Sequence, residues 1–424
     1  MNEEFLQFIW QNRLFENSSL ITHTGEEVEV LHVGSRSCDS GPDFVNARIR
    51  VGDTIWAGNA EIHLRSGDWF RHGHHTDKAF DNVILHIVGE NNAIVKRQNG
   101  EEIPTIELKY NPWFATKYAE LKSSRTWIPC EKDFFVEDDF QFNSWLERLA
   151  VERLEQKAVR VRALLDNYKN DWEEAFYCAL ATNLGYKINA QPFEMLAKST
   201  PLNILLRHKD NLLQVEALLF GQAGFLTQAL FDDPYCSSLK KEYSFLKKKY
   251  NLQGVENHLW QFLRLRPAGF PTIRMAQLSA LICKSNPLFS KILEASDLQR
   301  IRSLFRAEPS PYWVTHFQFN KTSVSQVKIL GGDIIDSITI NTLVPFLFTY
   351  GQTHGNQQYK DTALEYLQQV EAENNAVLRG WEKYGVKASN AMFSQALLQL
   401  KNEYCNRHRC LACQVGSTIL QKRS

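Results

Sequence analysis

Residues 43–63 place two carboxylates and an imidazole where they can act together. Asp43 opens a run that alternates as a β-strand, and Glu61 and His63 lie on the next such run. Because side chains two positions apart on a strand share a face, Glu61 and His63 point the same way. Carboxylate oxygens on adjacent strands suit a hard divalent cation. The spacing therefore predicts an oxygen-rich pocket for Mg²⁺ or Mn²⁺.

A purely structural interpretation of the same residues remains open. Asp43 follows Gly41 and Pro42, so its carboxylate can close a turn. Glu61 can pair with an arginine across the sheet, as charged residues on strands commonly do.

Histidines are concentrated in the first part of the chain, and the densest polar cluster runs from Trp69 to Asp77. Neutral imidazoles are ligands for zinc, iron or manganese. The spacing of His72, His74 and Asp77 resembles the metal motif of metallo-β-lactamase-like hydrolases, but the terminal histidine of that motif is missing. One hypothesis is therefore a zinc hydrolase centred on residues 72–77. In a nuclease, His72 or His74 would instead contact the scissile phosphate.

Three cysteines lie close together near the C-terminus: Cys405, Cys410 and Cys413. Thiols at this spacing indicate metal ligation rather than packing. A zinc site or a [4Fe-4S] cluster needs a fourth ligand. Cys130 is the first candidate and His408 is the second.

The composition describes a soluble globular protein. The chain has 424 residues, 44% of them hydrophobic and 23% charged, and its formal net charge is zero. No global field therefore favours nucleic acid or an anionic membrane, and any nucleic-acid surface must be local. The N-terminus does not resemble a signal peptide, and no apolar stretch reaches the roughly 18 residues that span a bilayer. We expect a cytoplasmic protein without a membrane partner, whose cysteines are reduced or bound to metal.

The hydrophobic patterns predict an α/β N-terminal domain followed by a large, mainly α-helical region. We expect domain boundaries that give residues 1–130, residues 131–310, and a helical C-terminal region, residues 311–424, that ends in the cysteine cluster. The N-terminal elements are expected in the order α-β-β-β-α-β: a helix over 3–14, strands over 28–33, 44–51 and 55–64, a short helix and loop over 68–82, and a strand over 83–88.

Basic residues could form a local groove for phosphates, although the net charge is zero. The candidate nucleic-acid-binding residues are Arg71, Arg153, Arg160, Arg264 and Arg266. The alternative is that each basic run is an ordinary solvated face, because Glu147, Glu152 and Glu155 interleave the arginines of the long helix.

The element order and the spacing from Gly-Pro-Asp at 41–43 to Glu-Ile-His at 61–63 resemble the PD-(D/E)XK nuclease superfamily. The resemblance implies a restriction-endonuclease-like core in which Asp43, Glu61 and the Ile62 carbonyl hold the metal. His63 stands where that superfamily has a lysine, so its role in positioning or deprotonating water is an expectation only.

The chain as a whole resembles an uncharacterised bacterial family catalogued as a domain of unknown function. The stretches that carry this resemblance include residues 41–44, 61–63, 68–75, 262–267 and the terminal cysteines. It implies no activity.

Three functions follow from these patterns. The first is a Mg²⁺- or Mn²⁺-dependent phosphodiesterase, a nuclease acting on DNA or RNA, with Asp43, Glu61 and His63 as catalytic residues and His72 and His74 beside them. The second is a non-catalytic nucleic-acid-binding or scaffold protein with a degenerate site, favoured by histidine in place of lysine. The third is the zinc hydrolase.

Overall fold

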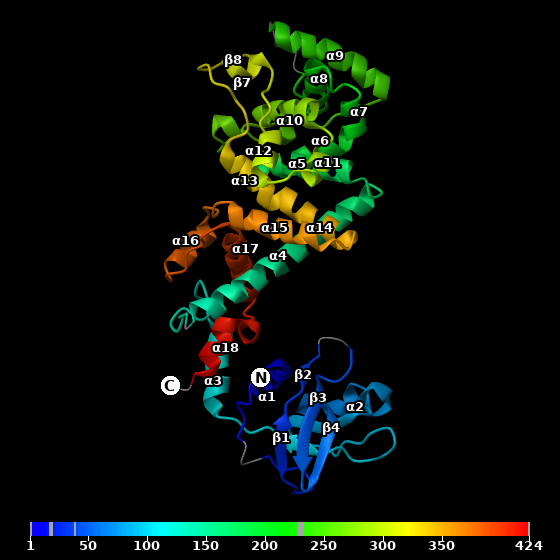
Figure 1. The fold of residues 1–424 in the computed structure, drawn as a ribbon, viewed down its shortest axis with the longest axis vertical. Helices are drawn as coiled ribbons and strands as arrows, with labels where there is room; N and C mark the ends of the chain where they lie inside the picture. The colour runs from blue at the N-terminus through cyan, green and yellow to red at the C-terminus, as the bar shows by residue number, and fades with distance from the viewer. Residues whose placement is uncertain (1, 17–19, 38–39, 137, 228–232, 423–424) are drawn as a thin grey trace. The chain divides into compact units, whose positions relative to one another are not determined.

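The structure is a computed structural model that describes residues 2–16, 20–37, 40–136, 138–227 and 233–422. It divides the chain into two compact units. The first consists of residues 1–145 together with 400–424, and the second of residues 146–399. In Figure 1 the labelled strands of the first unit, β1 to β4, are blue, and the helices of the second unit run from green through orange to red.

The first unit combines a sheet with short helices. Its elements are α1 (Glu3–Gln11), β1 (Val28–His32), β2 (Ser35–Arg36), β3 (Phe44–Val51), β4 (Thr54–Arg65), α2 (Asp68–Arg71), η2 (His74–Thr76), η3 (Lys78–Phe80), β5 (Val83–Glu90), β6 (Thr105–Glu107), α3 (Pro112–Ser123), the start of α4 (Asp139–Asn167), η8 (Leu400–Cys405), η9 (Cys410–Ala412) and α18 (Gln414–Gln421).

The sheet is mixed and has six strands, in the order β1-β3-β4-β5-β6 with β2 beside β3. β1, β3 and β4 pair antiparallel, whereas β5 is parallel to β4 and β6 is parallel to β5. The parallel register sets Glu61 opposite His86 and His63 opposite Val88. A bulge between Phe44 and Ala47 contains Asn46, whose φ is 59°.

The two faces of the sheet have different covers. On one face Phe44 and Ala60 are paired and fully buried, and a side chain at Gly89 would meet Leu6 of α1. α2 packs against the other face of β4, where Trp69 lies edge-on to His63. The first face is therefore core, and the second face carries the polar residues of the candidate site.

The second unit is mostly helical. Its elements are the remainder of α4, α5 (Trp172–Leu184), α6 (Tyr186–Ser199), α7 (Leu202–Leu206), α8 (Leu212–Gln222), α9 (Pro234–Tyr250), η4 (Asn257–Leu259), η5 (Pro267–Gly269), α10 (Pro271–Ser285), α11 (Leu288–Leu293), α12 (Leu298–Leu304), η6 (Pro311–Val314), the strands β7 (His316–Gln318) and β8 (Lys321–Thr322), α13 (Gly332–Ile338), η7 (Thr339–Leu343), α14 (Val344–Thr353), α15 (Gln357–Gln369), α16 (Ala376–Glu382) and α17 (Ala391–Gln399).

The expected succession of an α/β part and a mainly helical region is confirmed. The division into units differs from the expected boundaries at residues 130 and 310, because the last 25 residues belong with the sheet. α3 was not predicted from the sequence, although Asn111 caps it and proline occupies its first turn, a common helix start.

One helical run, Gly332–Thr353, is long and apolar enough by length and composition to cross a membrane. This corrects the expectation that no stretch is long enough to span a bilayer, because α13, η7 and α14 join into 22 residues in the structure. Of its most apolar window, 72% is buried inside the protein, as is also common for a core helix of a soluble protein. It is therefore a weak indication of a membrane span.

The core of the second unit contains a carboxyl group with no exposed surface. Glu216 on α8 accepts a hydrogen bond of 2.6 Å from the Tyr235 hydroxyl, which also lies 2.9 Å from Ser310 Oγ. Burial raises the pKa of Glu216 to about 7, because an ion without water is costly. Folding therefore favours the protonated carboxyl group.

The buried carboxyl group predicts a stability that falls as the pH rises. Below pH 4.5 Glu216 is protonated in both states, and between pH 4.5 and about 7 only the unfolded state loses the proton. The ionised group then costs about 3 kcal/mol. Glu216→Gln should raise the melting temperature at pH 8 and leave it nearly unchanged at pH 4.5. The exposed control Glu294→Gln should show no such difference, and equal shifts at both pH values would contradict the prediction.

Candidate metal centre

Asp43 and Glu61 are joined by reciprocal backbone contacts where β3 meets β4. The Asp43 N–H donates to Glu61 Oε2 at 2.9 Å, and the Ile62 N–H donates to Asp43 Oδ2 at 3.1 Å. Glu61 is buried, and Asp43 is half-buried. Two carboxylates are therefore held side by side at the start of a strand, as the spacing predicted.

The first helix adds a residue that sequence reasoning missed. Gln7 of α1 donates from Nε2 to Asp43 Oδ1 at 2.8 Å, and its Oε1 accepts a bond of 2.8 Å from Arg36. Glu3 of the same helix is close enough to raise the pKa of Asp43 electrostatically. Gln7 fixes the orientation of the Asp43 carboxylate. The only signal for Gln7 in the sequence was a polar residue within the apolar pattern of the helix.

Three imidazoles lie close together, and two of them face the second oxygen of Glu61. One ring nitrogen from each of His63, His72 and His74 lies within 4.8 Å of the others. His63 Nε2 is 3.6 Å from Glu61 Oε1, and His74 Nε2 is 3.4 Å from the same atom. His72 Nδ1 lies 3.2 Å from His63 Nε2. The strand residues and the loop histidines thus form one cluster.

The loop after β4 brings two of these rings back to the strand. α2 ends at His72, and Gly73 then adopts a φ of 79°, a left-handed conformation that favours glycine. This reversal starts η2 at His74, whose ring stacks on Phe80 with centroids 3.7 Å apart. Trp69 packs edge-on against the same ring. Apolar packing thus orients His74.

His86 supports His63 from the neighbouring strand. His63 Nδ1 lies 2.8 Å from His86 Nε2, and the His86 ring is fully buried. When His63 Nδ1 carries the proton, it donates a hydrogen bond to His86 Nε2. The other ring nitrogen, His63 Nε2, then has a lone pair directed at the cluster of imidazoles. This arrangement is typical of a metal-bound histidine, whose other ring nitrogen is held by a second residue.

Burial shifts the pKa values of the site toward neutral side chains. It raises the pKa of Glu61, and the neighbouring charge of Asp43 raises it further. Burial likewise raises the pKa of Asp43. Burial lowers the pKa of His63 to about 3, and the nearby His74 and His72 contribute to this decrease. A divalent cation would offset the energetic cost of burying two charged carboxylates. Such a cation binds imidazole only in its neutral form.

The donor set consists of imidazole nitrogens and one carboxylate oxygen. Such a set suits Zn²⁺, Mn²⁺ or Fe²⁺ better than Mg²⁺, which prefers oxygen ligands alone. His63, His72, His74 and Glu61 can therefore hold a divalent cation. Asp77 does not join them, because its side chain accepts a hydrogen bond from the Ala79 N–H and caps η3.

The remaining candidate residues occupy different surroundings. Arg71 is exposed and pairs with Asp68 at 2.9 Å, and Arg153 donates to Gln395 Oε1 at 2.7 Å within the second unit. Three arginines lie on the surface of the second unit: Arg160, Arg264 and Arg266. Four cysteines are buried in the first unit: Cys130, Cys405, Cys410 and Cys413.

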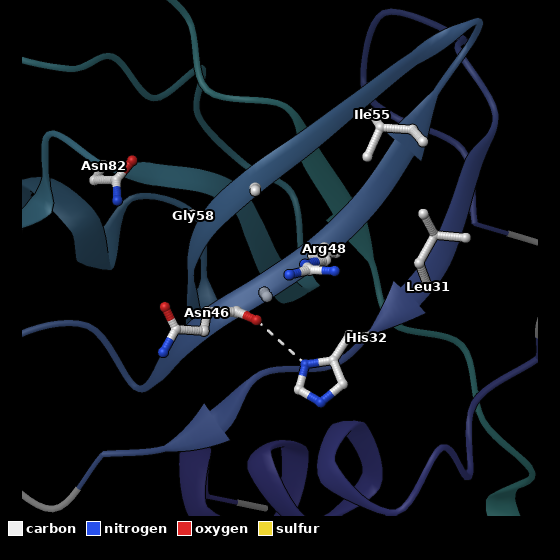
Figure 2. A pocket seen from close by; sticks show the side chains of 9 residues that line it. Leu31, His32, Asn46, Arg48, Ile55, Gly58 and Asn82 are labelled. Carbon is white, nitrogen blue, oxygen red and sulfur yellow. Dashed lines mark hydrogen bonds between the residues drawn. The ribbon is translucent and has the colours of Figure 1, made fainter.

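An open hollow of about 770 Å³ lies on the sheet beside the site, and Figure 2 shows its lining. Arg48 and Ala57 are paired across β3 and β4, and strand alternation places Ala57 on the same face as Glu61. Four residues along a strand span about 13 Å. His32 Nδ1 lies 3.2 Å from the Asn46 carbonyl oxygen at the rim (Figure 2). The hollow and the imidazole cluster thus share one sheet face.

The family model described as "Protein of unknown function (DUF2851)" matches residues 3–376, so the chain belongs to this family. No curated protein gives a significant match to the chain. No solved structure gives one either.

The geometry predicts about one Mn²⁺ bound per chain at Glu61 and the three imidazoles. Glu61→Gln and His74→Ala should each abolish this binding, measured by the electron paramagnetic resonance signal of free Mn²⁺. Mn²⁺ is a suitable probe because thiolates bind it poorly, so the cysteines do not contribute.

A matched control is His75→Ala, which removes the adjacent imidazole. His75 packs against Phe70 and is not one of the three converging histidines. Loss of Mn²⁺ in the His75 variant as well, or retention in both site variants, would contradict this assignment.

Proposed function

We propose that this protein is a metal-dependent phosphodiesterase that cleaves DNA or RNA. The observation that carries the proposal is the convergence of Glu61 Oε1 with His63 and His74, beside the carboxylate of Asp43. This constellation lies on a sheet face that continues into an open hollow next to Arg48. A cation site whose sheet face also carries a hollow with an exposed arginine suits a substrate with a phosphodiester backbone.

The topology supports a restriction-endonuclease-like core. The helix α1, the four antiparallel strands β1 to β4 and the short helix α2 precede β5, which is parallel to β4. Apart from the two-residue strand β2, this is the α-β-β-β-α-β order. In the PD-(D/E)XK nucleases that this order resembles, an acidic residue opens one strand and Glu-x-Lys lies on the next. Asp43 and Glu61 occupy the two acidic positions, and His63 replaces the lysine.

The replacement changes the chemistry expected of the third position. A lysine contributes a fixed positive charge, whereas burial keeps His63 neutral. A ring that stays neutral suits a metal ligand, and a general base needs a pKa near the working pH. We therefore assign His63 as a ligand together with Glu61, His72 and His74.

The bound cation would stabilise the charge that develops on the phosphoryl group and would make water more acidic. The Asp43 carboxylate lies beside Glu61, and Gln7 and the Ile62 N–H hold it in place. Its raised pKa suits a group that accepts a proton from the attacking water.

The hollow supplies polar groups for the substrate strand. Arg48 is exposed, and among the described residues no carboxylate pairs with it, whereas Arg50 on the same strand is paired with Glu29. The Arg48 guanidinium can contact phosphate oxygens, and Asn46 and Asn82 at the rim can donate to them. Because the net charge of the chain is zero, such local cations must supply the affinity.

The catalytic prediction is cleavage of labelled DNA or RNA in the presence of Mn²⁺ or Zn²⁺ and none with EDTA. Glu61→Gln should lower the rate at least about 100-fold, because the metal is lost. Asp43→Asn should lower it roughly 100- to 10,000-fold, because proton transfer is lost. The control Asp77→Asn removes a carboxylate from the loop that carries His72 and His74, and it should keep the rate.

Two results would overturn the assignment. Cleavage that is equal in the Glu61 variant and the original chain would point to a contaminant. Binding of nucleic acid without cleavage on any single- or double-stranded substrate would favour a non-catalytic binding protein, the alternative that histidine in place of lysine leaves open.

The hollow makes a separate prediction about binding. Arg48→Ala should weaken nucleic-acid binding several-fold and reduce the slope of log K against log salt by about one, since one phosphate contact is lost. The control Lys109→Ala removes one positive charge just after β6, at a residue that does not line the hollow. It should change neither the affinity nor the slope. Fluorescence anisotropy across a salt series measures both, and an unchanged slope for the Arg48 variant would exclude a phosphate contact there.

A further inference from the structure

Four buried cysteines from two distant segments gather in the first unit. Cys130 follows α3, whereas Cys405, Cys410 and Cys413 lie on the C-terminal segment that joins this unit. All four side chains are buried. Among the described residues they are all free thiols.

Electrostatic coupling shows that these thiols are near one another. The pKa of Cys130 rises to about 12 chiefly because of burial, and the charges of Cys413 and Cys410 raise it further. The pKa of Cys405 is raised by burial and then by Cys413, Cys130 and Cys410. Each sulfur is thus within electrostatic range of others in the group.

The backbone that carries Cys410 and Cys413 is tightly packed. Cys410 begins the single turn of η9, and the Cys413 N–H donates to the Cys410 carbonyl oxygen at 3.3 Å. A Cβ at Gly416 would lie 2.3 Å from that oxygen, so only glycine permits α18 to pack here. The N–H groups of Gly416 and Val415 donate to the Cys413 sulfur.

Burial disfavours negative charge on the sulfurs, and it raises the pKa of Cys413 to about 11. Smaller effects act in the other direction: backbone N–H donors lower the pKa of Cys413, and the nearby Lys401 ammonium lowers that of Cys405. Lys401 is itself buried and bonded to Asn406 Oδ1. These groups offset part of the cost of a thiolate, and a bound cation would offset the rest.

His408 is the alternative fourth ligand. It adopts a φ of 51°, and its Nδ1 lies 3.2 Å from the Leu121 carbonyl oxygen of α3, a bond that joins the C-terminal segment to α3. Cys130 is favoured as the fourth donor because it is a buried thiol within electrostatic range of Cys413 and Cys410.

We propose that Cys130, Cys405, Cys410 and Cys413 bind a thiophilic metal centre, either a zinc ion or an iron–sulfur cluster. Four deprotonated cysteines are a complete ligand set for either. The centre would tie the chain after α3 to the C-terminal segment, so its role is to stabilise the first unit. It is separate from the imidazole site and does not depend on the proposed function.

The test is metal and sulfide analysis of the full-length protein, purified without oxygen or added chelator. We expect about one zinc, or about four iron with about four sulfide, per chain. Substitution of Co²⁺ in a zinc form should give thiolate charge-transfer bands that an imidazole and carboxylate site does not give. Cys405→Ser and Cys130→Ser should each lose the metal and the bands.

Two controls separate this site from its surroundings. Cys178→Ser changes an equally buried thiol of the second unit and should keep the metal, as should Glu61→Gln. If the site variants do not fold, titrating the original chain with a mercurial reagent should release metal in proportion to the thiols modified. A chain that holds neither zinc nor iron, or full retention in Cys405→Ser, would overturn the proposal.

Discussion

The burial of Glu61 is the constraint on which the candidate site depends. A carboxylate with little access to water must be neutralised, hydrogen-bonded or paired with a cation. Here one oxygen accepts the Asp43 N–H and the other faces His63 and His74. Neutral imidazoles cannot compensate the charge fully, and the second carboxylate at Asp43 adds to it. A divalent cation would satisfy the carboxylates and the lone pairs together.

The parallel pairing of β4 with β5 makes this arrangement possible. It sets His86 opposite Glu61, where its ring holds His63 in a fixed orientation. A parallel partner needs a crossover connection, and that connection contains α2 and the turn carrying His72 and His74. The same strand pair therefore explains both why the carboxylate is buried and why the imidazoles reach it.

Strand periodicity made part of the site predictable, and loop geometry limited the rest. Alternation alone places Glu61 and His63 on one face, because a strand allows no other arrangement. The meeting of this pair with residues 72–74 depends on the left-handed turn at Gly73, whose path the sequence does not reveal. The sequence therefore left open whether His72 and His74 lie beside the carboxylates or form a separate zinc site. Asp77 looked like a ligand by spacing, but in the structure it caps η3. Gln7 had no spacing signal, since its contact depends on how α1 docks.

Different donor chemistry lets the two candidate metal sites of the first unit coexist. The sheet site offers imidazoles and carboxylate oxygen, and the cysteine site offers sulfur alone. Soft thiolates select zinc or iron–sulfur clusters, whereas a mixed nitrogen and oxygen site accepts Mn²⁺. The ligands also differ in their sequence range, since Glu61 to His74 form a local set but Cys130 and Cys413 are far apart. A metal held by ligands far apart in the sequence contributes more to the folding of the unit, because its binding closes longer loops of the chain. The sheet site is accordingly the better candidate for chemistry, and the cysteine site for stability.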